Sequence, residues 1–389
     1  MASIPIAYNL RNLKVRKATT VMTALGIGLT VAVLMGIGAL VDGLTGALAV
    51  SGHPRNLILM RQGSTAELVS IIPKEKFDVA KFLPGIEELD GEPMVSYEVI
   101  SVTNLVLRSN TQSDGNVTVR GLSPIGLKMR PDVELVSGRW FEPGKREVVV
   151  GSGVHAIRAS TSIGDTIPYG RGDWEVVGVF DAGRSAFNSE IWTDGNFATS
   201  DLGRGSTRNV ILLRAQDDAA AQAIANRVAD DQRLNLEAKF ERAYYEDQMS
   251  SAGPIRGLGI FVALIMAVGS SFAAMNTMYT AVARRNREIG VLRMLGFSRA
   301  SILTSFLIES LMLSFCGAVA GLALVLPLSG LKGRIGNFVT FSETTFSFEI
   351  TPINVAIGFA FAAVMGVLGG LLPARQAAAK EILTSMRDL

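Results

Sequence analysis

Four long apolar stretches, almost free of charge, limit the folds open to this chain more than any other feature. They occupy residues 18–41, 257–283, 300–331 and 350–374, and Glu309 is the single charged residue inside them. Each exceeds the roughly 20 residues that an α-helix needs to cross a hydrocarbon core of about 30 Å. The first stretch is also too long for the hydrophobic region of a secretory signal peptide. The sequence therefore predicts four transmembrane helices.

The composition agrees with a membrane protein. Of the 389 residues, 48% are apolar and 19% are charged, which is too apolar for an ordinary soluble protein of this length. The net charge of +2 is small, and the basic residues gather at the edges of the apolar stretches. We therefore expect no nucleic-acid partner. The single cysteine, Cys316, lies in an apolar stretch and excludes an intrachain disulfide.

The segment between the first two stretches has the character of a soluble domain. Its strand-like runs are rich in Val, Ile and Leu and end at Gly, Asp or Pro; they lie at 57–60, 99–107, 117–119, 147–150, 174–180 and 210–213. Helices are predicted at 74–82 and 218–228. The second helix lies between the last of those strands and another near 234–240, which indicates a βαβ unit. With about 210 residues, the segment is long enough for an α+β domain with its own core, in one or two parts.

Positive charge predicts the orientation in the membrane. One basic cluster precedes the first stretch, a second fills the connection between the second and third, and a third follows the fourth. The positive-inside rule places all three in the cytoplasm. Both termini are then expected inside and the α+β domain outside.

The predicted fold is an α-helical membrane protein with four transmembrane helices and a large extracytoplasmic α+β domain. Its expected parts are a cytoplasmic amphipathic segment (1–17), a first transmembrane helix (18–42), the α+β domain (43–255), a second transmembrane helix (256–283), a cytoplasmic basic segment (284–299), a third transmembrane helix (300–331), an outer loop (332–349), a fourth transmembrane helix (350–374) and a cytoplasmic tail (375–389).

The basic segment combines dense positive charge with a short amphipathic helix. Arginines open it, and apolar residues then recur at helical spacing from Ile289 to Leu295, until Gly296 ends the helix. Such a helix suits the cytoplasmic face of a membrane, where it can receive force from a soluble partner. The alternatives are a loop that only sets topology and an anchor to anionic membrane lipid.

The amino-acid sequence of this segment resembles that of the FtsX-domain permeases of MacB-like, or type VII, ABC transporters. The similarity rests on EIGVLR at 288–293, the Leu295–Gly296 pair and FLIE at 306–309. It extends to LLPARQAA at 371–378 and to the α+β segment between 138 and 194. In that family the outer domain is a MacB-like periplasmic core with porter and sabre-like parts.

The resemblance implies a non-catalytic permease subunit whose basic segment is a coupling helix that docks on an ABC ATPase. The residues that it assigns to this contact are Arg284, Arg285, Arg287, Glu288, Ile289, Gly290, Leu292, Arg293 and Gly296. ATP and magnesium would bind to a separate ATPase chain, because this sequence has no Walker A motif, and no cofactor is expected on this chain. Further expected partners are a second permease copy or paralogue, which gives a dimer, and a periplasmic adaptor with an outer-membrane channel.

The implied mechanism is mechanotransmission, in which ATP hydrolysis drives a periplasmic conformational change that exports an envelope substrate from the inner membrane. Two alternatives stay open on the same resemblance. One is a lipoprotein-releasing permease similar to LolC and LolE, and the other is a signalling regulator of a cell-wall hydrolase, similar to FtsX. The outer domain is larger than is usual for the second alternative.

Glu309 is the polar residue in the spans that needs an explanation. An unpaired carboxylate at this depth costs about 2.5–3.5 kcal/mol on insertion scales. We expect it to pair with a basic side chain near the cytoplasmic end, such as Arg293, and to link the coupling helix to the third span. A metal site has no support, because His53 and His155 lie far apart without further ligands at suitable spacing.

The orientation can be tested by cysteine labelling. With Cys316 replaced by serine, a cysteine placed between residues 43 and 254 should react with an impermeant maleimide in intact spheroplasts. A cysteine placed after residue 375 should react only after lysis. Labelling in the opposite order would contradict the predicted topology.

Overall fold

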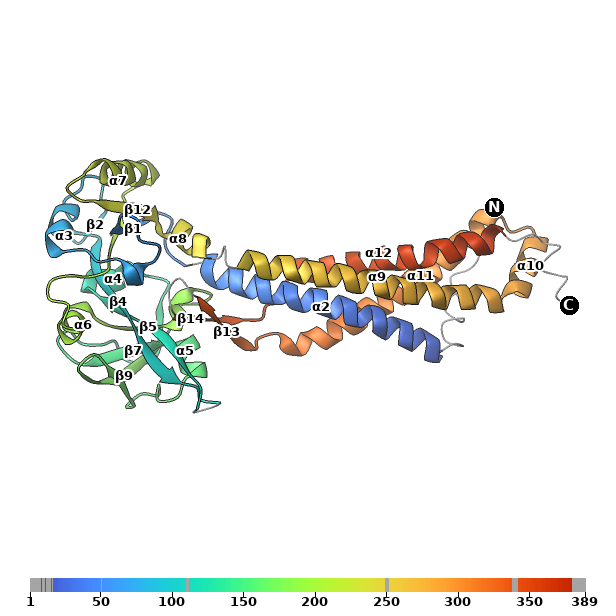
Figure 1. Cartoon of the computed structure of the whole chain (residues 1–389), viewed down its shortest axis with the longest axis horizontal. Coiled ribbons are helices and arrows are strands. Elements are labelled where there is room, and N and C mark those ends of the chain that lie inside the picture. Colours follow the sequence, from blue (N-terminus) through green and yellow to red (C-terminus); the bar gives the residue numbers. More distant parts are fainter. Residues whose placement is uncertain are drawn as a thin grey trace. The chain divides into compact units, whose positions relative to one another are not determined.

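The computed structural model of the protein describes residues 17–49, 51–109, 112–248, 252–337 and 342–379, together with Tyr8, Arg11 and Val15. They form two compact units (Figure 1): a helical unit within 1–42, 253–331 and 348–389, and an α+β unit within 43–252 and 332–347. The chain passes between the units at four junctions, after residues 42, 252, 331 and 347. Most of the expected amphipathic segment (1–17) and the end of the expected tail (375–389) lie outside the described residues.

Within the described ranges, the helical unit has four helices that are long and apolar enough to cross a membrane, which confirms the four predicted spans. Its elements are α2 (Lys17–Ala49), α9 (Ala252–Arg284), α10 (Asn286–Met294), α11 (Arg299–Val325), the 3₁₀ turn η4 (Leu326–Leu328) and α12 (Pro352–Ala379). Helix α11 ends before the expected residue 331 because η4, which contains Pro327, follows it. Helix α12 continues beyond residue 374 through an alanine-rich end.

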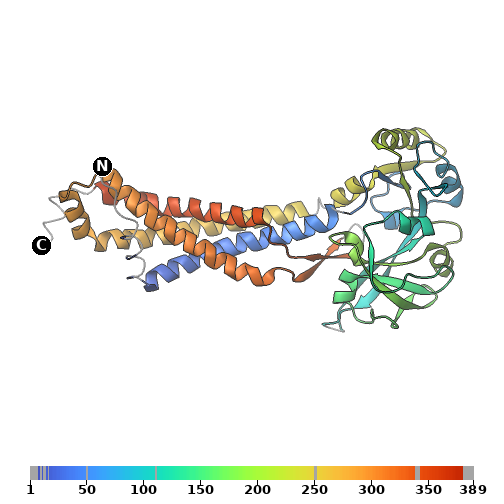
Figure 2. The same cartoon turned by 180° about the vertical axis from the view of Figure 1, so that it is seen from behind.

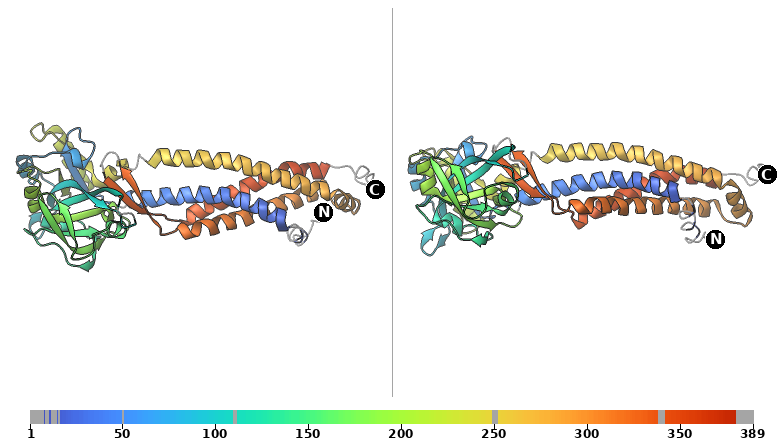
Figure 3. Two further views of the ribbon diagram at one scale, coloured as in Figure 1. Left: turned by 60° about the horizontal axis from the view of Figure 1, so that its bottom comes forward. Right: turned by 90° about the horizontal axis from the view of Figure 1, so that it is seen from below.

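Small residues set the contacts within the helical unit. Helices α2 and α11 meet so closely that a Cβ atom on Gly321 would lie 2.6 Å from the carbonyl oxygen of Gly28. Helices α11 and α12 run side by side (Figure 2), and Ser310 Oγ donates a 2.7 Å hydrogen bond to the carbonyl oxygen of Gly366. Such close backbone approach drives helix association in lipid, where apolar burial gives no net force. Helix α9 lies along one side of the unit (Figure 3), with the smallest share of buried residues among the four.

The α+β unit is built on a ten-stranded sheet. The strand order is β12-β1-β11-β4-β5-β10-β7-β9-β6, with β8 paired to β9. The strands are β1 (Asn56–Arg61), β4 (Val95–Val106), β5 (Asp114–Leu122), β6 (Glu134–Gly138), β7 (Glu147–Gly151), β8 (Thr166–Tyr169), β9 (Gly172–Asp181), β10 (Glu190–Asp194), β11 (Val210–Arg214) and β12 (Leu236–Phe240). A separate pair joins β2 (Glu88–Leu89) to β3 (Glu92–Pro93).

Short helices connect and cover these strands. They are η1 (Glu67–Val69), α3 (Lys74–Ala80), α4 (Pro124–Lys128), α5 (Ser152–Ile157), η2 (Ala186–Ser189), α6 (Gly195–Asp201), α7 (Asp218–Asp230) and α8 (Glu241–Gln248). Strands β11 and β12 both pair antiparallel with β1, so α7 joins two parallel strands that flank β1. The predicted βαβ unit is therefore confirmed, with one strand between its two strands.

Two hydrophobic cores divide the sheet into two lobes that share the long strand β4. The first lobe holds β1, β11, β12, α3 and α7, around buried residues such as Leu57 and Leu213. The second lobe holds β5 to β10 with α5 and α6, around residues such as Val150 and Trp174. Strand β4 pairs with β11 over residues 95–98 and with β5 over residues 99–106. One continuous strand therefore runs through both cores.

The outer loop expected at 332–349 is a β-hairpin, and most of it belongs to the α+β unit. Strands β13 (Lys332–Asn337) and β14 (Ser342–Ser347) pair antiparallel. Arg158 donates from Nη2 to a Glu343 carboxylate oxygen at 2.6 Å. Ser189 Oγ lies 2.8 Å from Thr345 Oγ1 and accepts a 2.8 Å hydrogen bond from the Thr345 N–H group. The hairpin is thus fastened to the second lobe, although its own sequence is mainly polar.

The attachment of the hairpin can be tested by cross-linking. With Cys316 replaced by serine, the pair Ser189→Cys and Thr345→Cys should oxidise to a disulfide under mild conditions, because the two side-chain oxygens lie 2.8 Å apart. Peptide mass spectrometry before and after reduction measures the bond. Single-cysteine variants are the controls, and a double variant that keeps both thiols would contradict the attachment.

Candidate functional site

Two sharp turns isolate the short helix α10 between two spans. Helix α9 ends at Arg284, and Arg285 occupies the turn before α10, with φ −107° and ψ 16°. At the other end, Gly296 adopts φ +87°, a left-handed conformation that ends helices without the strain a side chain would add. The Ser298 side chain then caps α11 by accepting a 3.1 Å hydrogen bond from the Ser301 N–H group.

The buried side of α10 packs among three spans. Ile289 is 2% exposed and Gly290 is also buried. Ile289 belongs to a cluster with Val282 of α9, Phe306 of α11 and Ala377 of α12. The position of α10 is therefore linked by apolar contacts to three of the four spans.

The opposite side of α10 carries apolar and charged residues whose side chains are exposed. Val291, Met294 and Leu295 are 49%, 51% and 71% exposed. Arg287 and Glu288 are exposed beside them. These five residues are here called the docking face of α10. They recur at helical spacing, which puts them on one side of the helix.

A buried ion pair joins the turn before α10 to the third span. Arg285 and Glu309 are only 5% and 3% exposed, and Arg285 Nη1 donates to a Glu309 carboxylate oxygen at 2.8 Å. The guanidinium carbon of Arg285 also lies 6.0 Å from the centre of the Phe306 ring. A carboxylate this far from water needs such a partner. The expected pairing of Glu309 with a basic residue is correct, but the expected partner, Arg293, is wrong.

The other residues assigned to the coupling contact have different surroundings. Arg284 is exposed, while Leu292 and Arg293 are half-buried. Arg293 donates from Nη1 to the Phe297 carbonyl oxygen at 3.4 Å, so it faces the turn after α10 rather than Glu309. Arg285 faces the bundle interior, so it can act on a soluble partner only through the helix that it positions.

A second buried charged cluster, which the sequence analysis missed, lies in the α+β unit between the two lobes. Arg120 of β5 contacts three carboxylates, Glu67, Glu98 and Glu190, at 2.8, 3.0 and 2.8 Å. Arg130 forms a second ion pair with Glu98 at 2.9 Å. Burial alone would raise the pKa of Glu98, but Arg130 and Arg120 outweigh it and lower that pKa. The sequence signal was a charged residue, Glu98 or Arg120, adjacent to Val or Tyr in the buried parts of β4 and β5.

This cluster adjoins the segments that lead to and from the helical unit. Glu241, in α8 before α9, accepts hydrogen bonds from the His53 N–H group at 3.0 Å and from Asn56 Nδ2 at 2.8 Å, both in the segment after α2. Burial raises the pKa of Glu241. Tyr244 of α8 accepts a hydrogen bond from the Glu67 N–H group at 3.0 Å. The entry and exit segments of the α+β unit are thus bonded to each other and to the charged cluster.

Across the described part of the chain, no group of three or more His, Cys, Asp or Glu side chains could hold a metal ion. His53 is half-buried, and the pKa of its imidazole is lowered by burial and by Arg214. His155 contacts the Thr161 carbonyl oxygen at 3.0 Å. Neither histidine takes part in a catalytic arrangement with the other.

Two family models match the chain, one over α2 and most of the α+β unit and the other over the remaining spans. Residues 20–231 match the MacB-like periplasmic core domain, and residues 260–382 match the FtsX-like permease C-terminal domain. The first match covers more than half of the chain. The protein therefore belongs to the FtsX-type permeases of MacB-like ABC transporters.

Individual relatives cover the chain to different extents. It is 26% identical to the uncharacterized ABC transporter permease YknZ of Bacillus subtilis, over 98% of both chains. It is 25% identical to the macrolide export ATP-binding/permease protein MacB of a Shewanella strain, over 92% of this chain but only 56% of that protein. The crystal structure of the periplasmic region of MacB from Actinobacillus actinomycetemcomitans matches 50% of this chain, with 14% identity and a TM-score of 0.37.

The buried ion pair gives a stability prediction. Glu309→Ala should lower the free energy of unfolding in mixed micelles by about 3–5 kcal/mol, because it leaves the Arg285 charge buried without a partner. The double variant Arg285→Met and Glu309→Leu should recover most of that loss. Glu288→Ala is the matched control, since this exposed acid lies 4.0 Å from Arg285 and contributes little. A single variant as stable as the control would contradict the pairing.

Proposed function

We propose that this protein is the permease subunit of a MacB-like ABC system, in which α10 docks on an ATPase and the α+β unit does work outside the cytoplasm. The observation that carries the proposal is the docking face of α10. It exposes three apolar side chains on a short helix whose other side is held within the bundle. Grouped apolar side chains outside the spans are typical of a protein interface when charged residues border them.

A force applied to α10 would be transmitted to the spans through direct side-chain contacts. Its buried residue Ile289 packs against α9, α11 and α12, and the Arg285–Glu309 pair ties the preceding turn to α11. Packed interiors transmit displacement because they have little free volume. A push on the docking face would therefore move several spans together instead of unfolding one loop.

The spans have covalent continuity with the α+β unit. Helix α2 is a single helix that continues past the junction at residue 42 as far as Ala49, and α9 begins at the junction near residue 252. In the proposed mechanism, ATP-driven movement of the coupling helix passes along these helices to the outer unit. This mechanotransmission needs no polar pore through the bilayer.

The proposal includes the expected orientation and partners. Both termini and α10 lie in the cytoplasm, and the α+β unit lies on the periplasmic side of the bacterial inner membrane. ATP and magnesium bind to a partner ATPase, and a second permease copy or paralogue completes the dimer. Several relatives are named as macrolide export proteins, which favours export of an envelope substrate through a periplasmic adaptor and an outer-membrane channel.

The docking assignment is tested by charge and polarity changes on α10. Arg287→Glu and Leu295→Asp should each weaken co-purification with the ATPase by about tenfold or more and abolish the stimulation of ATP hydrolysis, because both lie on the docking face. Membrane insertion should be unchanged.

Arg299→Glu is the matched control, because Arg299 is an exposed arginine of the same basic cluster at the start of α11, outside α10. It should keep both co-purification and stimulation. If Arg299→Glu reduces both as strongly as Arg287→Glu does, the cluster acts as a lipid anchor and the docking assignment is wrong.

A further inference from the structure

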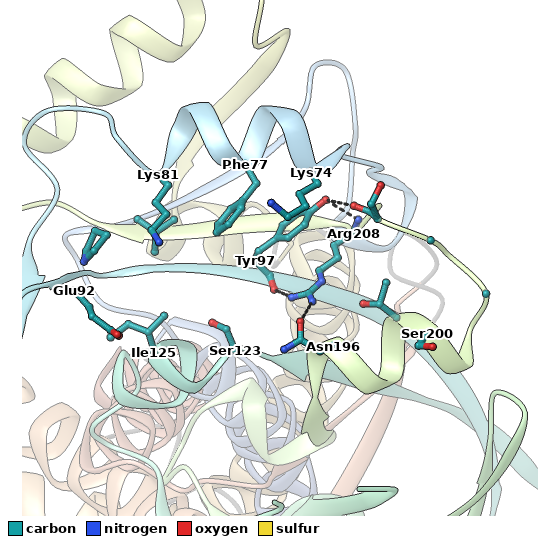
Figure 4. Close-up of a pocket in the computed structure, with 16 residues that line it drawn as sticks. Lys74, Phe77, Lys81, Glu92, Tyr97, Ser123, Ile125, Asn196, Ser200 and Arg208 are labelled. Atoms are coloured by element: carbon teal, nitrogen blue, oxygen red, sulfur yellow. Dashed lines mark hydrogen bonds between the residues drawn. The ribbon is translucent and has the colours of Figure 1, made fainter. Parts of the chain in front are cut away.

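A groove of about 800 Å³ lies in the α+β unit where the two lobes meet. Figure 4 shows Lys74 and Phe77 of α3, with Lys81 directly after the helix, along one side. Ser123, Asn196 and Ser200 lie along the other side, and Tyr97 and Arg208 lie between them. The first side belongs to the first lobe, and α6 on the other side belongs to the second lobe. Pockets for small ligands have volumes of about 300–1,000 Å³ and are common between domains.

The middle of the groove is a stack of two aromatic rings and a cation. The rings of Phe77 and Tyr97 lie 4.7 Å apart with an angle of 12° between their planes. The guanidinium carbon of Arg208 lies 4.9 Å from the centre of the Tyr97 ring. The two rings cover each other's facing surfaces, so the stack gives the groove an apolar wall with a positive charge at one end, which suits an apolar ligand with a negative end.

Arg208 has no carboxylate partner within ion-pair distance among the described residues. Its side chain donates to two neutral acceptors, the Tyr97 carbonyl oxygen and Asn196 Oδ1, the latter at 2.6 Å. A guanidinium has five N–H donors, so further donors are available to a ligand. Burial lowers the pKa of Arg208, yet arginine stays protonated in proteins. A half-buried charge without a direct ion pair to any described residue is therefore kept in this groove, although Asp194 and Glu98 act on its pKa from a greater distance.

A second cation, Lys81, lines the groove directly after α3. Lys81 is half-buried, and its ammonium group has no hydrogen bond or ion pair to any described residue. Lys74, by contrast, is neutralised by Asp78 at 2.7 Å. Glu92 is the acidic residue of the lining, and it is exposed at the edge. The groove thus contains two positive charges, Arg208 and Lys81, that have no direct ion pair with any described residue.

We propose that this groove binds a small amphipathic organic anion, with an aromatic body against the Phe77–Tyr97 stack and a carboxylate attracted by the charges of Arg208 and Lys81. Apolar residues such as Val95 and Ile125 line the part of the groove that would hold the body. Such a ligand would bridge the first and second lobes. The proposal does not depend on the ATPase contact or on export.

The test uses the full chain in lipid nanodiscs, with binding of a fluoronaphthoate followed by fluorine NMR. Empty nanodiscs measure partition into lipid. The expected result is saturable binding of the fluoronaphthoate, and at least about tenfold weaker binding of the matching neutral amide, which lacks the charge. No saturable binding up to ~10 mM would overturn the proposal, since that is near the weakest affinity expected for a ligand of this size.

Variants locate the site. Arg208→Gln and Lys81→Gln should each weaken binding by about tenfold, and Ser200→Trp should block the groove without changing its charge. Lys76→Gln is the matched control, because Lys76 lies on the same helix but does not line the groove. Thermal unfolding of each variant shows whether it is folded, and Lys81→Gln keeps the test valid if Arg208→Gln is not. Equal binding to Lys81→Gln, Ser200→Trp and Lys76→Gln would overturn the proposal.

Discussion

The ion pair between Arg285 and Glu309 is the interaction on which the α10 end of the helical unit depends. Each charge would be expensive to hold at this depth without the other, so neither side chain is free to leave. The pair fixes the turn between α9 and α10 against α11, at 2.8 Å, and Ile289 then fixes the buried side of α10. The docking face gains its orientation from these two contacts, because a short helix of nine residues is not stable alone.

The α+β unit also contains buried charged side chains that are paired with opposite charges. Arg120 is buried among three carboxylates and holds η1, β4 and β10 around β5. Such a cluster contributes little net stability compared with an apolar core, but it strongly disfavours any arrangement that separates its members. The charged clusters of both units therefore act as fixed points, while the apolar contacts around them supply the free energy of folding.

The sequence predicted the spans and the fold class well because both depend on local patterns. Four apolar stretches with Glu309 as their single charged residue gave four helices, and most predicted strands occur within one or two residues of their expected positions. The partner of Glu309 could not be predicted, since Arg285 and Arg293 are both close in sequence and only the turn at Arg285 decides which one faces inward. The attachment of the hairpin through Arg158 was also hidden, because a contact between residues far apart leaves no local pattern. The groove beside Arg208 could not be predicted for the same reason, because its two sides come from segments that are far apart in the sequence.

In the proposed mechanism, the positions of the four junctions decide how movement of the spans would reach the α+β unit. The segments after α2 and before α9 meet at Glu241, beside the charged cluster that both lobes share. The hairpin, in contrast, is fastened through Glu343 and Thr345 to the second lobe. Displacement of α2 and α9 would therefore act on both lobes, whereas displacement of α11 and α12 would act through the hairpin on the second lobe. In the proposed mechanism, unequal movement of these two pairs of helices would therefore load one lobe against the other at the Arg120 cluster and at β4, which hold the two lobes together.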